Sequence, residues 1–252
     1  MSFAVPADVY ARFMGRFSEP LAVAFAEYAG LRAGQTALDV GSGPGALTTQ
    51  LVDRLGADAV AAVDPSPPFV AALRARLPDV DVRAASAEDL PFPDDAFDAT
   101  LAELVVHFMS DPVAGLREMA RVTRPGGVVA ACVWDHDGGR SPLSTCWQAA
   151  TELDPDVVDE AGLAGAREGH LEELCAEAGL RDVESTVLSV DVVFDDFDTW
   201  WHPYTNGVGP LGDYLRSLDE SRLEALRSRC AELVLPTPFT IRGSAWTVRA
   251  RA

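Results

Sequence analysis

The sequence predicts an α/β fold built on a doubly wound, largely parallel sheet. Short apolar segments alternate with amphipathic ones between residues 37 and 134, and these short segments are apolar throughout instead of alternating in polarity. Strands that are buried on both faces have this character, and helices then cover both faces of the sheet. A glycine-rich stretch also follows the first apolar segment directly, which is where such folds place a ligand.

Each strand of this region is expected to end at a turn signal. The five strands are expected at residues 37–40, 59–63, 80–84, 97–104 and 128–134. The helices between them are expected at residues 46–55, 67–77 and 113–122. In the first of these helices, leucines recur at four-residue spacing and form one apolar face. A further helix is expected in front of the sheet, from an N-cap at Ser18 to a stop at Gly30.

The pattern changes after the fifth strand. Residues 141–166 show no clear periodicity, whereas the apolar spacing of residues 170–178 predicts a helix. Two long strands with partial alternation are expected at residues 183–194 and 239–249. A helix at about residues 220–233 is expected between these two strands.

We treat residues 1–252 as a single domain. It has an N-terminal arm and helix at residues 1–36, a core at residues 37–134 and an insertion at residues 195–235. A helical insertion between the last two strands would lie over one edge of the sheet. Insertions of this size often cover a substrate, so we expect a lid.

The charge of the chain excludes several classes of partner. The net charge is −19, so nucleic acid and anionic membranes are repelled at long range. The chain contains no lysine, so no Schiff-base mechanism and no lysine general base are available. We therefore expect neither a nucleic-acid partner nor membrane insertion, and no segment approaches the ~20 apolar residues that span a bilayer.

The four cysteines do not form a recognisable site. None belongs to a CxxC pair, and no histidine cluster lies near them, so neither a zinc site nor a disulfide framework is indicated. The N-terminal sequence lacks the basic and apolar regions of a signal peptide. We expect a cytoplasmic protein with reduced thiols and no metal. The sequence leaves the oligomeric state open.

The stretch ALDVGSGPGALTTQ (37–50) fits two cofactor-binding templates. Three of its residues match the GxGxxG/A loop that cradles the pyrophosphate of NAD, and Asp64 lies at a suitable distance to bind a ribose. Gly45 extends the loop without adding a side chain, and the carboxylate of Asp39 precedes the loop. A carboxylate here suits a ligand with an ammonium group, which S-adenosylmethionine (SAM) has and NAD lacks. SAM also carries no phosphate for the helix N-terminus.

Four motifs, in this order, resemble the class I SAM-dependent methyltransferases. They are LDVGSGPG (38–45), VDPSPPFV (63–70), SAEDLPFPDDAFD (86–98) and RVTRPGG (121–127). The resemblance is greatest to the small-molecule branch that includes the ubiquinone and menaquinone biosynthesis type, and YARFMGR (10–16) resembles the N-terminal arm of some members. It implies a Rossmann-like, seven-stranded sheet with the last strand antiparallel, in which residues 37–134 form the SAM-binding core.

The resemblance also implies which residues contact SAM. The glycine loop with Asp39 would hold the methionine part, Asp64 would accept hydrogen bonds from both ribose hydroxyls, and residues 86–88 would contact the adenine edge. Many relatives have Asp where this chain has Ser86. Glu103 ends the fourth strand, beside the expected position of the methyl group. The expected cofactor-binding residues are Tyr10, Asp39, Gly41, Ser42, Gly43, Gly45, Asp64, Pro65, Ser86, Ala87, Glu88 and Glu103.

The reaction implied is transfer of the SAM methyl group to a small molecule by in-line displacement, with S-adenosylhomocysteine as the product. Alignment supplies most of the rate, and a general base helps when the acceptor is a hydroxyl or an acidic carbon. His107 is our candidate base. Residues 102–107 lack the Asn-Pro-Pro-Tyr type sequence of many amide and nucleobase-amine methyltransferases, which also favours a small-molecule acceptor.

Two alternatives stay open at this point. One is a protein that binds SAM without transferring its methyl group, and the other is an NAD-linked oxidoreductase, which the absence of lysine disfavours. An aromatic wall around the acceptor would favour a flat or cationic substrate. Its candidates are Trp147, Trp200, Trp201 and Tyr204. The acceptor and the atom that is methylated are not identified by any motif.

Overall fold

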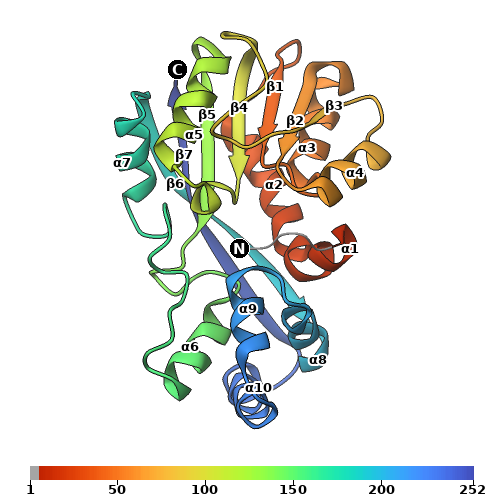
Figure 1. The fold of residues 1–252 in the computed structure, drawn as a ribbon, viewed down its shortest axis with the longest axis vertical. Coiled ribbons are helices and arrows are strands. Elements are labelled where there is room, and N and C mark those ends of the chain that lie inside the picture. Colours follow the sequence, from red (N-terminus) through yellow and green to blue (C-terminus); the bar gives the residue numbers. More distant parts are fainter. Residues whose placement is uncertain (1–5) are drawn as a thin grey trace.

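The computed structural model describes residues 6–252 and contains one seven-stranded sheet of order β3-β2-β1-β4-β5-β7-β6 (Figure 1). The strands are β1 (Ala37–Val40), β2 (Val60–Asp64), β3 (Asp81–Ala84), β4 (Phe97–Glu103), β5 (Thr123–Trp134), β6 (Arg181–Phe194) and β7 (Phe239–Arg251). The first five pair in parallel, and β7 is antiparallel to both β5 and β6. The expected sheet with an antiparallel last strand is confirmed.

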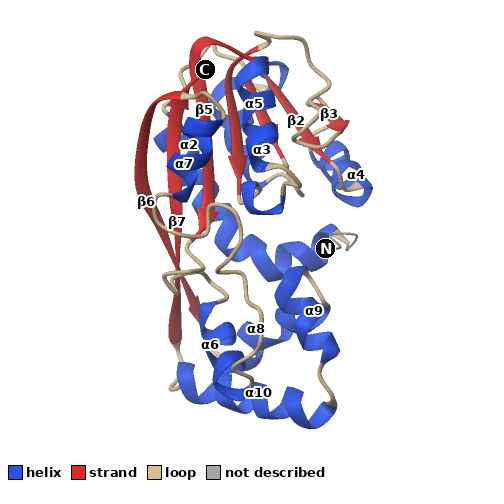
Figure 2. Ribbon diagram, turned by 60° about the vertical axis from the view of Figure 1, so that its left-hand side comes forward, coloured by secondary structure: helices blue, strands red, loops and turns tan. Residues whose placement is uncertain are grey.

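Helices cover both faces of the sheet, as the apolar strands predicted (Figure 2). They are α2 (Arg16–Ala29), α3 (Ala46–Leu55), α4 (Pro67–Arg76), α5 (Pro112–Val122) and α7 (His170–Glu177). Buried side chains of α2, α3 and α4 pack in one apolar cluster, and those of α5 and α7 pack in a second. The short turns η2 (Ala57–Ala59) and η3 (Val106–Phe108) follow α3 and β4.

The N-terminal helix differs from the prediction at its start. Helix α1 (Ala7–Tyr10) runs into a π-helical turn, η1 (Ala11–Gly15), and α2 begins directly after it at Arg16. Ser18 is therefore a buried residue inside the helix and does not act as its N-cap. The Ser-Glu-Pro pattern was misleading because the chain before it is already helical. The stop at Gly30 is confirmed, with φ 71°. Residues 1–5 of the expected arm lie outside the described residues.

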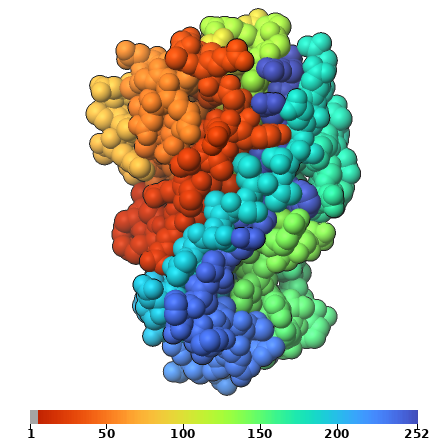
Figure 3. Space-filling model, turned by 180° about the vertical axis from the view of Figure 1, so that it is seen from behind, coloured from red at the N-terminus to blue at the C-terminus, as the bar shows by residue number. Residues whose placement is uncertain are grey.

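A second group of helices lies beyond the carboxyl ends of the parallel strands (Figures 1 and 2). It consists of α6 (Ser144–Leu153), α8 (Phe197–Trp201), η4 (His202–Asn206), α9 (Gly209–Ser217) and α10 (Glu220–Val234). The insertion supplies all of these except α6, which lies in the stretch that showed no periodicity. Figure 3 shows β6, in cyan, running down the back of the molecule from the sheet to these helices.

The two groups of helices share one apolar core. Phe13 from the N-terminal segment contacts Tyr204 of the insertion, with ring centroids 5.5 Å apart, and both belong to the cluster that fills the α2–α3 face of the sheet. The insertion is thus packed against the edge at which the strands end. Among residues 6–252, no helix combines the length and the apolar character needed to cross a membrane.

Candidate functional site

The loop after β1 lies at the carboxyl edge of the sheet and has the backbone that its glycines predict. Gly41, Gly43 and Gly45 have φ values of 72°, 52° and 98°, a region that side chains other than glycine disfavour. A Cβ atom added at Gly43 would meet no atom within 4 Å among the described residues. Gly43 thus leaves open space above the loop, so a ligand can approach its backbone closely.

Asp64 ties this loop to the end of β2. Its Oδ2 accepts a hydrogen bond from the Gly43 amide at 2.8 Å, and its Oδ1 accepts one from the Ser66 amide at 2.7 Å. The side chain is buried, and burial raises its pKa. Pro65, which follows it, is exposed. Each carboxylate oxygen has further lone pairs, so Asp64 has the capacity to accept ligand hydroxyls as well.

Two carboxyl groups lie buried at the ends of β1 and β4. Oδ2 of Asp39 accepts a hydrogen bond from Thr48 Oγ1 at 2.6 Å, whereas Oε1 of Glu103 has no hydrogen-bond partner within residues 6–252. Burial, together with the neighbouring charge of Asp39, raises the pKa of Glu103 well above its ordinary value. Burial raises the pKa of Asp39 to about 7. A cation beside Glu103 would compensate the negative charge of the two carboxyl groups and so favour their ionised forms.

A first cavity lies between the glycine loop and the N-terminal helices. The loop contributes Gly41, Ser42 and Gly43 to its wall, and Glu103 and Tyr10 line it from β4 and α1. Ser42 Oγ is buried and, like Glu103 Oε1, lacks a partner among the described residues. The cavity therefore offers a hydroxyl and a carboxyl group to a ligand that carries both a polar backbone and a positive charge. The methionine part of SAM, with its ammonium and sulfonium groups, fits these requirements.

The residues expected at the adenine edge lie on the segment after β3 and do not line this cavity. Ser86 is half-buried and Ala87 is buried. Glu88 Oε1 accepts hydrogen bonds from the amides of Ser110 and Asp111, at 2.7 and 3.3 Å. Oε1 of Glu88 therefore anchors the loop before α5, while Oε2 and the backbone of Glu88 remain for a ligand.

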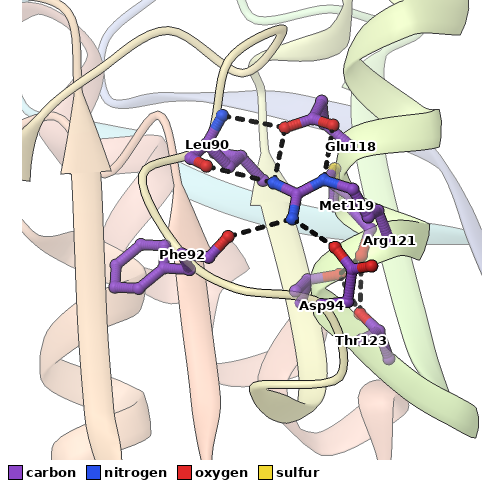
Figure 4. A network of polar contacts seen from close by, with 8 residues as sticks. Leu90, Phe92, Asp94, Glu118, Met119, Arg121 and Thr123 are labelled. Atoms are coloured by element: carbon purple, nitrogen blue, oxygen red, sulfur yellow. Dashed lines mark hydrogen bonds and ion pairs between the residues drawn. The ribbon is translucent and has the colours of Figure 1, made fainter.

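A hydrogen-bond network holds this segment against α5 (Figure 4). The guanidinium of Arg121 donates to the carbonyl oxygens of Leu90 and Phe92, at 3.1 and 2.9 Å. It also pairs with Glu118 at 2.7 Å and with Asp94 at 2.8 Å. Glu118 in turn accepts from the Leu90 amide at 3.0 Å. One side chain of the RVTRPGG motif thus positions the SAEDLPFPDDAFD motif.

A second cavity adjoins the first, and Tyr10 and Leu104 line both. Most of its wall is apolar. Its other lining residues are Phe13, Met14, His107, Phe108, Trp134, His136, Leu143, Glu160, Val208, Gly209, Pro210 and Leu211. The insertion supplies the last four, so it closes the cavity opposite the sheet.

The titratable groups deepest in the second cavity include two histidines and one glutamate. The rings of His107 and His136 lie with their centroids 6.0 Å apart, and both side chains are buried. Burial lowers the pKa of His107 well below its ordinary value and lowers that of His136 to about 4. Both imidazoles are therefore neutral at physiological pH. Glu160 Oε2 accepts from Trp147 Nε1 at 2.8 Å, and burial raises its pKa to about 7.

Leu104 separates the two cavities in a strained conformation. Its φ is 60°, in the left-handed region, and its amide donates to the Cys132 carbonyl at 2.9 Å. Such a conformation in a residue other than glycine costs about 1–3 kcal/mol, and strain of this kind concentrates at functional sites. No sequence signal distinguishes Leu104 from a strand residue, so sequence reasoning did not select it.

The aromatic wall comes from residues other than those expected. Trp200, Trp201 and Tyr204 pack inside the core that the insertion shares with the sheet. Trp147 belongs to the same core and reaches the second cavity only through its hydrogen bond to Glu160. The aromatic lining comes instead from Tyr10, Phe13, Phe108 and Trp134. Phe108 and Trp134 follow β4 and end β5, and that position at the carboxyl edge is the signal that could have found them.

Comparison with known proteins agrees with the fold and the glycine loop. Residues 38–131 match the methyltransferase domain family. An uncharacterized methyltransferase of Mycobacterium tuberculosis is 44% identical over 103 residues, which are 41% of this chain and 41% of that protein. A demethylmenaquinone methyltransferase of Paenarthrobacter aurescens is 29% identical over 181 residues, which are 65% of this chain and 69% of that protein.

A solved structure extends the likeness to nearly the whole fold. Phosphoethanolamine N-methyltransferase 2 of Haemonchus contortus, in complex with SAM, superposes with a TM-score of 0.55 at 17% identity, over 92% of this chain and 52% of that one. By contrast, the first relatives are matched over only 41% of their own length. The likeness in sequence is therefore confined mainly to the half of the chain that holds the glycine loop.

Proposed function

We propose that this chain, which belongs to the class I SAM-dependent methyltransferases, transfers the methyl group of SAM to a small organic acceptor and releases S-adenosylhomocysteine. The observation that carries the proposal is the buried pair of Asp39 and Glu103 at the carboxyl edge of the sheet. Glu103 faces the first cavity and has no partner for one of its oxygens within the described chain. A cationic cofactor supplies the charge that this pair lacks.

The residues around the first cavity would hold SAM in a fixed order. Glu103 would bind the ammonium group, and the glycine loop with Ser42 would hold the carboxylate and the chain next to it. Asp64 would accept the ribose hydroxyls, since its two amide contacts leave lone pairs on both oxygens. The adenine would lie near Pro65 and the backbone of residues 86–88, with Tyr10 closing the site.

The second cavity would hold the acceptor. Bound SAM supplies an activated methyl group on a positively charged sulfur. The contribution of the protein is to align the acceptor and to exclude water, and alignment can be worth ~7–11 kcal/mol in model reactions. Leu104 and Tyr10 line both cavities, so they lie where the two reactants meet. His107 would take a proton from the acceptor at a ring nitrogen.

The remaining expectations belong to the same proposal. The acceptor is a small molecule, because the second cavity is apolar and closed by the insertion, which would act as a lid at residues 195–235. A nucleic-acid acceptor does not fit a chain of net charge −19. We also propose that transfer needs no metal and that the protein works in the cytoplasm.

Calorimetric titration with SAM, S-adenosylhomocysteine and NAD tests the proposal. We expect micromolar binding of the two adenosyl ligands and no binding of NAD. Asp64→Ala and Glu103→Gln should weaken SAM binding at least about tenfold, whereas Asp58→Asn, at an exposed position that lines neither cavity, should not. Binding of NAD alone would contradict the proposal. Binding of SAM without methyl transfer to any acceptor would favour the alternative of a non-transferring SAM-binding protein.

A further inference from the structure

The second cavity contains hydrogen-bonding groups that the fold itself leaves unused. Nδ1 of His107 and both ring nitrogens of His136 are buried without a partner in residues 6–252. Buried polar atoms in native proteins nearly always have a partner, so each exception calls for an explanation. Both histidines line the cavity, and the two come from different strand ends. Their unused capacity is therefore directed at a bound molecule.

We propose that the acceptor is a flat, uncharged, largely apolar molecule with a hydroxyl group. This hydroxyl group lies between His107 and His136 and receives the methyl group. The inference rests on the methyl transfer proposed above. In this arrangement His107 takes the proton and is a catalytic residue. His136 donates a hydrogen bond to the same oxygen and is a positioning residue.

The geometry of the pair suits a hydroxyl group. A neutral imidazole has one N–H donor and one acceptor nitrogen, and a hydroxyl group has one donor hydrogen and acceptor lone pairs. One hydroxyl can therefore accept from one ring and donate to the other. Each such hydrogen bond spans about 2.7–3.0 Å. The ring centroids are 6.0 Å apart, so an oxygen atom can reach a nitrogen of each ring only from beside the line that joins the two rings.

The two histidines of the cavity offer no charge that would compensate an anionic acceptor. The two imidazoles remain neutral because burial lowers the pKa of each. They therefore offer no charge to a carboxylate or an ammonium group. Glu160 is the third polar group, and its Oε2 already accepts from Trp147. No arginine lines the cavity within residues 6–252, so an anionic acceptor would lie there uncompensated.

The walls indicate a flat molecule. Tyr10, Phe13, Phe108 and Trp134 supply aromatic surface to the cavity wall. Trp134 Nε1 is also buried without a partner among the described residues. This N–H group is a further donor, for a second oxygen on the acceptor.

The proposed step balances without a further reagent. A lone pair of the hydroxyl oxygen forms the new O–C bond as the C–S bond of SAM breaks, and the electron pair of that bond stays on sulfur, which becomes a neutral thioether. The hydroxyl proton moves to the unprotonated ring nitrogen of His107 and then to water. The products are a methyl ether and S-adenosylhomocysteine.

A binding experiment tests the hydroxyl preference without relying on turnover. Calorimetry in the presence of S-adenosylhomocysteine would compare 2-naphthol, 2-methoxynaphthalene and trimethyl(2-naphthyl)ammonium. We expect the wild type to bind 2-naphthol about tenfold more tightly than its ether, which corresponds to about 1.4 kcal/mol, and to bind the cation more weakly still. His136→Phe should abolish the preference for the hydroxyl, and His136→Gln should restore part of it.

The controls separate this proposal from the proposed function. His202→Phe changes an exposed histidine outside the cavity and should keep the preference. All variants should bind S-adenosylhomocysteine like the wild type, which also shows that they fold. Equal binding of the naphthol and its ether, no binding of either, or a preference that survives in His136→Phe would overturn the inference. Tightest binding of the cation would overturn it in favour of an amine acceptor. Failure of the wild type to bind S-adenosylhomocysteine would instead overturn the proposed function.

Discussion

At the scale of single residues, the site is made of titratable groups whose charged forms are disfavoured by burial. The imidazoles of His107 and His136 lose protons more easily than usual, and the carboxyl groups of Glu103 and Glu160 keep theirs to higher pH. All four groups lie at the carboxyl edge of the sheet or face it across the second cavity. A cationic ligand would favour the ionised form of Glu103, so cofactor binding and loss of the Glu103 proton are linked.

Substitution of His107 tests its role as the base. His107→Ala should lower kcat about 10²–10⁴-fold with an acceptor that the wild type methylates, because that is the usual contribution of general acid–base catalysis. The affinity for SAM, measured by calorimetry, should stay unchanged, since His107 does not line the first cavity. Full turnover in this variant would show that His107 is not the base. His202→Ala is the matched control.

At the scale of elements, the strand ends could be predicted and their long-range neighbours could not. The apolar segments and glycines predicted β1, β2 and β4 closely, because buried parallel strands have a local signature. The prediction was wrong at the start of β5, which begins at Thr123 and includes the Arg-Pro-Gly-Gly stretch that was expected to be a turn. The pairing of His107 with His136 depends on the register of β4 beside β5, and Glu160 reaches the cavity from an irregular stretch. Helix α6 was missed, although its buried residues Cys146, Trp147, Ala149 and Ala150 follow a helical spacing. The left-handed conformation of Leu104 has no sequence signal at all.

The network of Arg121 makes a prediction at this scale. Arg121→Ala should lower the free energy of unfolding by about 2 kcal/mol, since it removes several charge-assisted hydrogen bonds and leaves Glu118 without its cation. It should also weaken SAM binding, because the segment that carries residues 86–88 loses its anchor. Urea unfolding and calorimetry measure the two effects.

Arg117 provides the control for this prediction. It lies on the same helix, α5, and donates to one exposed carbonyl, that of Glu177, at 2.9 Å. Arg117→Ala should change the free energy of unfolding by about 0.5 kcal/mol or less, as exposed contacts usually do. If both variants lost equal stability, the network around Arg121 would not anchor the segment as described.

At the scale of the whole molecule, the insertion and the sheet enclose the second cavity together. Phe13 and Met14 of the N-terminal segment, Val208 and Leu211 of the insertion and Leu104 at the end of β4 all contribute to its wall. This enclosure is what buries Glu160 and the two histidines. Enclosing ionisable groups makes the stability of the entire fold depend on pH.

Glu160 gives this dependence a testable form. Its pKa in the folded protein, about 7, is above the ordinary value of 4.5, so the folded state binds more protons than the unfolded state between these values. The stability that Glu160 contributes is therefore present at low pH and is lost as pH rises through about 7.

Glu160→Gln removes this titration while keeping an acceptor for Trp147 Nε1. Between pH 5 and pH 8, the variant should gain about 2.5 kcal/mol in unfolding free energy relative to the wild type, since one pKa unit corresponds to about 1.4 kcal/mol. Urea unfolding at several pH values measures the difference. A constant difference between the two proteins across this range would contradict the burial of an ionisable carboxyl group there.

The central claim is that a cationic cofactor compensates the buried carboxyl groups of Glu103 and Asp39. Calorimetric titration with SAM near pH 6, in buffers of different ionisation enthalpy, tests this most directly, because it counts the protons released on binding. The raised pKa of each group predicts release of about one proton per site and an affinity that rises with pH. Glu103→Gln should lose most of this release. SAM binding without proton release, unchanged by Glu103→Gln, would contradict the account.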